Sequence, residues 1–157
     1  MFNQRAFSKI ITIVLIAVCM CLVGTPQAMA QSTHTQGCHH VHGTLTTQVV
    51  SAGLTQGTVT QRGRLKGTTQ DQISSFNASA GTYTATFQDM TKHGTLITND
   101  TGQSFSNGTF VENGTVDGAA STGRFAGATG SISFNGSSTD GVHFTAHITG
   151  EICGINP

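Results

Sequence analysis

The stretch VHFTAHITGEIC, from Val142 to Cys153, alternates apolar and polar residues and ends in a cysteine. Alternate residues of a β-strand point to the same side, so Val142, Phe144, Ala146 and Ile148 share one face. Threonine, histidine and glutamate side chains occupy the other face. One buried face and one solvated face are typical of antiparallel sheets. The stretch therefore predicts the last strand of an all-β domain.

A second cysteine, Cys38, stands just before the first stretch of the same kind. In a closed antiparallel barrel with an even number of strands, the first strand pairs with the last and closure removes exposed edges. If Cys38 lies opposite Cys153, the apolar faces match, with Leu45 opposite Ala146, Thr47 opposite Phe144 and Val49 opposite Val142. We expect a Cys38–Cys153 disulfide, which would stabilise the fold by about 4 to 5 kcal/mol in the chain-entropy model.

Between these stretches, a glycine followed by Thr or Ser and an apolar residue recurs, at Gly43, Gly57, Gly81, Gly94, Gly108, Gly114 and Gly130. Each such phrase predicts a strand start, because glycine suits a turn and the next two residues favour strands. Turns are also expected at Asn-Gly or Asp-Gly pairs beginning at Asn107, Asn113, Asn135 and Asp140. The irregular spacing of these phrases argues against a solenoid of equal repeats. We predict an all-β fold, a closed antiparallel barrel of about eight strands.

Residues 1–30 combine a basic start, an apolar run from Ile10 to Gly24 and the sequence AMA at 28–30. This pattern is typical of a cleaved signal peptide. The apolar run is short for a membrane span, and nothing comparable follows it. We expect a secreted protein, extracellular or periplasmic, with no membrane association after cleavage. Its expected parts are an N-terminal segment at 31–42, the barrel at 43–153 and a tail at 154–157.

The charge balance argues against nucleic-acid binding. After residue 30, five basic side chains stand against seven acidic ones, a surplus of two negative charges. Nucleic-acid-binding domains carry a marked basic surplus, so none is expected as a partner. The glycine-rich stretch TGRFAGATG (122–130) leads into the apparent strand SISF rather than a helix and has no following lysine, so it is not a phosphate-binding loop. We place Phe125 in the core and Arg124 in solvent.

The segment GAASTGRFAGATGSISF (Gly118 to Phe134), preceded by GTFVENGTV and followed by GVHFTAHITGEI, resembles the allene oxide cyclase-like and dirigent-like barrels of the calycin type. The resemblance implies a rigid, often oligomeric barrel with an apolar cavity for small hydrophobic molecules. Some members steer ring closure or radical coupling without a cofactor, by holding the substrate in one conformation. The plant cyclases use a pocket carboxylate with proline and asparagine nearby, whereas this chain has no proline within its barrel.

The expected cavity lining consists of apolar and aromatic residues on the inward faces: Val59, Leu65, Tyr83, Phe87, Phe110, Ile132, Phe134, Phe144 and Ile148. Glu112 shares strand parity with Phe110 and Val116, so in a regular strand its carboxylate would face the cavity as a catalytic acid or base. A bulge at Asn113-Gly114 would instead turn Val111 inward and Glu112 outward. We favour the bulge, because glycine at that position commonly permits one.

A second candidate site lies on the outer face near the predicted disulfide. The expected pairing brings together His40, His42, His147 and Glu151, donors that suit Zn²⁺ or Cu²⁺. A solvated patch is the alternative interpretation. Arg62, Arg64 and Lys66 are expected to alternate along the outward face of one strand, where charges keep a strand soluble.

These patterns predict a secreted barrel that binds a small hydrophobic molecule in its interior. One alternative is a cofactor-independent cyclase or isomerase with Glu112 as the reactive group, and another is a structural protein with a packed interior. No G-x-S-x-G motif indicates hydrolase chemistry. No cofactor is expected apart from the metal considered above, and a homo-oligomer is consistent with the resemblance.

Overall fold

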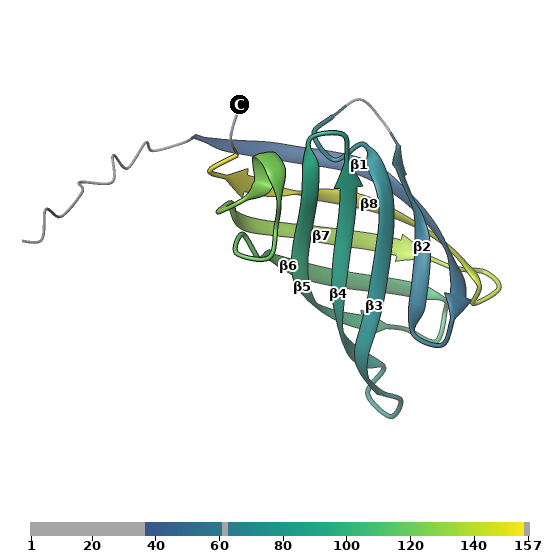
Figure 1. Ribbon diagram of the computed structural model, residues 1–157. Helices are drawn as coiled ribbons and strands as arrows, with labels where there is room; N and C mark the ends of the chain where they lie inside the picture. The colour runs from purple at the N-terminus through teal and green to yellow at the C-terminus, as the bar shows by residue number, and fades with distance from the viewer. Residues whose placement is uncertain (1–36, 61–62, 156–157) are drawn as a thin grey trace, which may run out of the picture. The chain divides into compact units, whose positions relative to one another are not determined.

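The computed structural model describes residues 37–60 and 63–155, which form a closed antiparallel barrel (Figure 1). The export signal predicted at residues 1–30 and the side chain of Arg62 lie outside these residues. The eight strands are β1 (Cys38–Ser51), β2 (Leu54–Thr60), β3 (Gly67–Asn77), β4 (Thr82–Thr91), β5 (Gly94–Ser104), β6 (Thr109–Val116), β7 (Thr129–Ser137) and β8 (His143–Cys153). Each strand pairs with its sequence neighbour, and the predicted fold class is confirmed. No helix in the described part of the chain is long and apolar enough to cross a membrane.

The barrel closes between β1 and β8 in the predicted register. Cys38 pairs with Cys153, Leu45 with Ala146 and Thr47 with Phe144. The predicted disulfide is also confirmed, with an S–S distance of 2.06 Å. The first strand begins earlier than expected, at Cys38 rather than residue 43, because the residues after Cys38 continue the pairing with β8.

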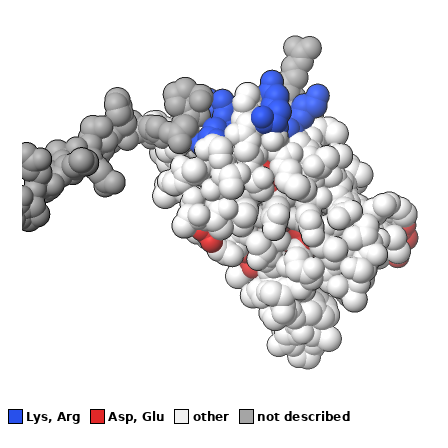
Figure 2. Space-filling model, in the orientation of Figure 1, with Lys and Arg blue, Asp and Glu red and all other residues white. Residues whose placement is uncertain are grey.

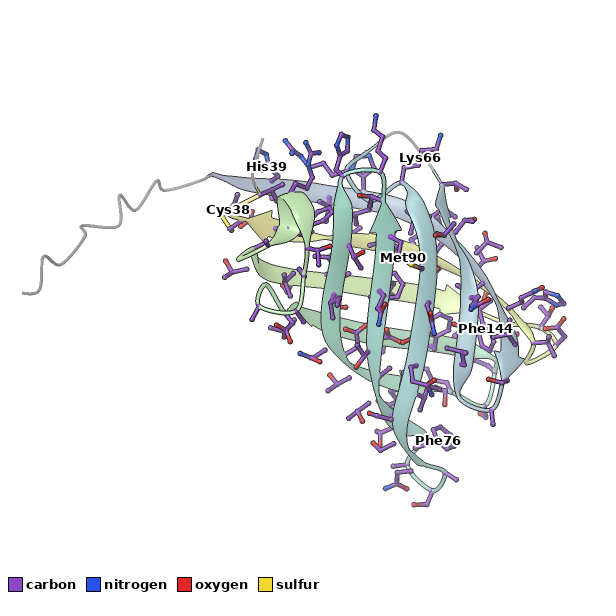
Figure 3. The ribbon with its side chains drawn as sticks, in the orientation of Figure 1. Cys38, His39, Lys66, Phe76, Met90 and Phe144 are labelled. Carbon is purple, nitrogen blue, oxygen red and sulfur yellow. A yellow bond between two sulfur atoms is a disulfide. The ribbon has the colours of Figure 1, made fainter. Side chains whose placement is uncertain are left out.

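The two ends of the barrel differ. At one end, here called the disulfide end, lie the cystine, the β4–β5 turn and the loops that join β2 to β3 and β6 to β7. The four connections after β1, β3, β5 and β7 lie at the opposite end, here called the cavity end. In Figure 3, Cys38 and Lys66 mark the disulfide end and Phe76 the cavity end.

The disulfide end is closed by the loop between β6 and β7. This loop contains a single turn of 3-10 helix, Gly123–Phe125, and hydrogen-bonds along the start of β5, where β6 has ended. Phe125 is fully buried, as predicted, and packs in the main core cluster. Ile155, expected in the tail, is also buried in that cluster. Arg124 is half-buried rather than fully in solvent.

The glycine phrases have two structural roles. Gly81, Gly94, Gly108 and Gly130 lie within one residue of a strand start, as predicted. The predicted starts at Gly43, Gly57 and Gly114 are wrong, as are the turns at Asn113-Gly114 and Asn135-Gly136, because these residues lie inside strands. Space is the physical reason: a Cβ atom would meet Val59 at Gly43, Thr47 at Gly57, Asp100 at Gly114 and the Phe110 ring at Gly136.

The expected strand through the basic run 62–66 is also wrong where it is described. Gly63, Arg64 and Leu65 form a bend and turn, and β3 begins only at Gly67. Leu65 is nevertheless buried in the core cluster, so the loop folds its apolar residue inward and leaves Lys66 exposed.

Candidate functional site

The barrel interior is packed near the disulfide end and hollow near the cavity end. The cavity has a volume of about 210 Å³. Its walls are Leu45, Thr47, Thr55, Asp71, Ile73, Phe76, Tyr83, Phe87, Ser104, Phe110, Glu112, Phe134 and Phe144. Most of this surface is apolar, and a few polar groups converge on it, the combination that small-molecule sites usually show.

Aromatic rings form much of the cavity wall. Phe87 meets Phe134 edge to face with ring centroids 4.9 Å apart, and Phe110 meets Phe144 in the same way at 5.9 Å. The Phe110 ring lies over Gly136 and the Tyr83 ring over Gly102, where a Cβ atom would collide with either ring. These glycines let large rings lie against the wall rather than across the cavity.

Glu112 faces this cavity and is only 5% exposed. Its neighbour Val111 faces outward and is 37% exposed. The bulge favoured from the sequence is absent, because β6 pairs without interruption with both β5 and β7 around Asn113 and Gly114. Gly114 is required for another reason, since a Cβ atom there would collide with the Asp100 carboxylate.

The Glu112 carboxylate is held by one strong contact. The Tyr83 hydroxyl donates a hydrogen bond of 2.7 Å to Oε2 of Glu112. Burial, and then the charge of Glu112, raise the pKa of the Tyr83 phenol well above its usual range, so the phenol stays protonated as the donor. The hydrogen bond fixes one carboxylate oxygen toward the wall.

Two further carboxyl groups point into the barrel beside Glu112. Burial, together with the charge of Glu112, raises the pKa of Asp71 to about 7. Burial and the proximity of Glu112 also raise the pKa of Asp100. Asp100 is 3% exposed, and its carboxyl group lies beside Glu112 and Thr98. The polar part of this site is therefore acidic.

The predicted lining residues divide into two groups. Tyr83, Phe87, Phe110, Phe134 and Phe144 line the cavity, whereas Val59, Leu65, Ile132 and Ile148 belong to the packed core instead. Toward the loop that carries Phe125, side chains of the core cluster fill the barrel interior, so inward residues there do not border the cavity.

Sequence reasoning missed Asp71, Ile73 and Asp100 at this site. Asp71 and Ile73 have alternate positions in β3, and Asp100 shares parity with the buried Leu96 in β5. The sequence signal for these residues was their alternation with buried apolar residues on the same strands. This signal was obscured because inward positions occupied by Thr, Asp and Gly look like a solvated face.

The expected histidine patch lies on the outer surface near the disulfide. His40 Nδ1 and Glu151 Oε2 are 3.6 Å apart, and both side chains are exposed. His42 pairs with Thr149, and His147 pairs with Thr44. Within the described ranges, the one group of three close metal-type donors is Cys38, Glu151 and Cys153, and both of its sulfurs belong to the disulfide. The structure thus brings together His40 and Glu151, without His42 and His147.

The described lysine and arginine side chains gather at the disulfide end (Figure 2). Arg64, Lys66, Lys92 and Arg124 border one open groove there, together with His93. None of these lysines and arginines forms an ion pair with a carboxylate of the described residues. Positive charge is therefore separated from the cavity by the packed half of the barrel.

Large apolar side chains surround the cavity end. Val49, Val50, Phe76, Phe105 and Val142 are all exposed there, in or beside the four connections. Fold and site together define an eight-stranded antiparallel β-barrel with an acidic, aromatic cavity that opens at one end. No protein-family model matches the chain, and no curated protein matches it either.

Proposed function

We propose that this protein is an exported binding protein that holds a small, largely apolar molecule in the barrel interior. The observation that carries the proposal is the cavity of about 210 Å³, whose aromatic walls remain unfilled while the other half of the barrel is solid. Burial of apolar ligand surface against such walls supplies roughly 25 cal/mol per Å² before the costs of binding.

Two further observations agree with this proposal. The Cys38–Cys153 disulfide is of the kind that persists in oxidising compartments, which supports export. The eight-stranded antiparallel barrel is also compatible with distant membership of the allene oxide cyclase-like and dirigent-like group. A packed interior, expected of a purely structural barrel, is found only near the disulfide end.

Native mass spectrometry of protein purified from its own host tests the proposal through a retained molecule. A second measurement uses the fluorescence of Tyr83, because the chain has one tyrosine and no tryptophan. Small aromatic probes that enter the cavity should change this emission in a saturable way.

A cavity-filling variant, Ile73→Trp, monitored by probe-induced amide shifts, should weaken probe binding at least ~10-fold, since Ile73 lines the cavity and tryptophan would fill part of its volume. Thr145→Trp places the same side chain on the exposed outer face of β8 and should leave the affinity unchanged. Equal loss in both variants, or no saturable binding of any probe, would count against an interior site.

Catalysis is the second candidate function, and one observation favours it. Glu112 is held by Tyr83, and burial brings the pKa of the neighbouring Asp71 to about 7. A carboxyl group that titrates near neutrality beside an oriented carboxylate is suited to proton transfer within an apolar cavity. A turnover assay on any molecule recovered from the cavity tests this candidate. Glu112→Gln should abolish turnover of that molecule, whereas Glu151→Gln, on the exposed outer face, should leave turnover unchanged.

A further inference from the structure

The charges of the barrel are sorted by location. Four carboxyl side chains are buried on inward positions or line the cavity: Asp71, Asp89, Asp100 and Glu112. The described lysines and arginines lie around the opposite, disulfide end. Among the described cavity-lining residues no cationic side chain is present, so the acidic groups there have no positive partner of their own.

Asp71 and Asp100 show that no cation compensates this acidity. One oxygen of Asp71 has no hydrogen-bond partner among the described residues, and the polar neighbours of the Asp100 carboxyl group are Glu112 and Thr98. Asp100 on β5 pairs with Gly114 on β6. Gly114 is the next inward position after Glu112, on the side of the disulfide end. Burying a polar group without a partner costs free energy, so such groups call for an explanation.

Glu112 carries the carboxylate at the centre of this acidic group. Tyr83 donates a hydrogen bond to its Oε2, and the Asp100 carboxyl group lies beside it. The aromatic faces of Tyr83, Phe110 and Phe144 line the same cavity. A buried carboxylate beside aromatic faces is the environment that attracts a cation, through direct charge pairing and through cation–π interaction.

We propose that the cavity recognises an amine, with its protonated head group on Glu112 and Asp71 and its apolar body against the phenylalanines. This inference rests on the proposed binding function and specifies its ligand class. The ammonium donates hydrogen bonds to carboxylate oxygens of Glu112 and Asp71. The apolar body extends toward the cavity end, along the lining residues Ile73, Phe76 and Phe144.

The competing ligand class is a neutral carbonyl compound that accepts a hydrogen bond from protonated Asp71. Both classes fit the same volume, but they respond in opposite ways to charge. A cation binds more tightly when the carboxyl groups ionise, whereas a carbonyl acceptor loses its donor.

A set of matched probes distinguishes these classes. Phenethylamine, phenethyl alcohol and phenylacetate have similar aromatic bodies and carry a positive, a neutral and a negative head group. Each is titrated into the full mature chain at about pH 8, with amide chemical shifts as the readout. We expect the amine to bind at least ~10-fold more tightly than the alcohol, and phenylacetate to bind most weakly.

Two isosteric variants complete the test. Glu112→Gln should reduce the preference for the amine over the alcohol at least ~10-fold without loss of alcohol binding. Glu151→Gln removes the same charge from the exposed outer face and should leave the preference intact. Amide spectra of each variant verify that the barrel remains folded.

The outcomes separate the two levels of the proposal. Equal or tighter binding of the alcohol, or an amine preference that survives Glu112→Gln, would overturn the amine assignment while leaving an interior binding site in place. Failure of all three probes to shift cavity resonances would overturn both the amine assignment and the binding function.

Discussion

The phenolic oxygen of Tyr83 lies 2.7 Å from Oε2 of Glu112, and this hydrogen bond links β4 to β6 across the intervening strand β5. The ring crosses β5 at Gly102, which has no side chain to obstruct it. Three residues on three strands thus combine to orient one buried carboxylate at the cavity wall.

Removal of the Tyr83 hydroxyl should destabilise the barrel. In Tyr83→Phe, the Glu112 carboxylate loses a hydrogen-bond donor while remaining buried, a change that costs about 1 to 3 kcal/mol. Urea unfolding followed by circular dichroism, with the disulfide intact, measures the free energy. In a Glu112→Gln background the same substitution should cost less, and an undiminished cost would show that the two side chains do not act together.

Gly102→Ala should disrupt the hydrogen bond between Tyr83 and Glu112 by displacing the Tyr83 ring. A Cβ atom at residue 102 would collide with the Tyr83 ring, so the ring must move away from Glu112 or the strands must shift. Overpacking of this kind typically costs about 1 to 3 kcal/mol. Gly63→Ala serves as the control, since its nearest neighbour would be 3.7 Å from the new atom. Equal stability of the two variants would contradict a role for glycine in seating the ring.

The unfolding free energy should fall as pH rises from about 4 to about 8. Burial raises the pKa of Asp71 and of Asp89 to about 7, and also raises the pKa of Asp100. Carboxyl groups with raised pKa hold extra protons in the folded state, so their stabilising contribution is present at low pH and lost through the folded-state pKa. Thermal unfolding at about pH 5 and about pH 8 measures the difference.

Asp89→Asn should flatten this pH dependence. Asp89 is 0% exposed, and its oxygens lack hydrogen-bond partners among the described residues. An amide at this position cannot ionise, so the variant avoids an ionisation cost of up to about 4 kcal/mol at high pH. Glu151→Gln, on the exposed surface, should retain the original slope. Parallel pH curves for Asp89→Asn and the unsubstituted protein would contradict the prediction.

Loss of the disulfide should lower stability without changing the topology. Cys38 and Cys153 are separated by 115 residues in the sequence. In the chain-entropy model, a cross-link over a loop of this length contributes about 4 to 5 kcal/mol. In urea unfolding, the double variant Cys38→Ala, Cys153→Ala should have an unfolding free energy lower by that amount. Reduction of the disulfide in the unsubstituted protein should have the same effect. A loss below about 1 kcal/mol would contradict the estimate.

Barrel closure was predictable from the sequence because two independent signals agreed. The alternation in Leu45 and Thr47 matches that in Phe144 and Ala146 in this register and in registers shifted by two residues, and the opposed cysteines select this one. A one-residue slip would have placed apolar side chains against polar ones. Registers supported by both patterning and a cross-link are therefore well determined.

The acidic side of the cavity was less predictable. Asn113-Gly114 has the composition of a turn, yet Gly114 lies in a regular strand because the space beside it holds the Asp100 side chain. Local sequence cannot show that a distant carboxylate fills the position of a missing side chain. For the same reason, inward Asp71 and Asp100 resembled residues of a wet face until the barrel placed them together.

The four connections at the cavity end are free of the cross-link and of the loop that seals the other end. Insertions or substitutions in these connections would reshape the cavity end. The closed disulfide end would still hold the eight strands of the barrel in register. For the proposed interior site, this division would let ligand selectivity change, by evolution or by engineering, with little effect on the stability of the barrel.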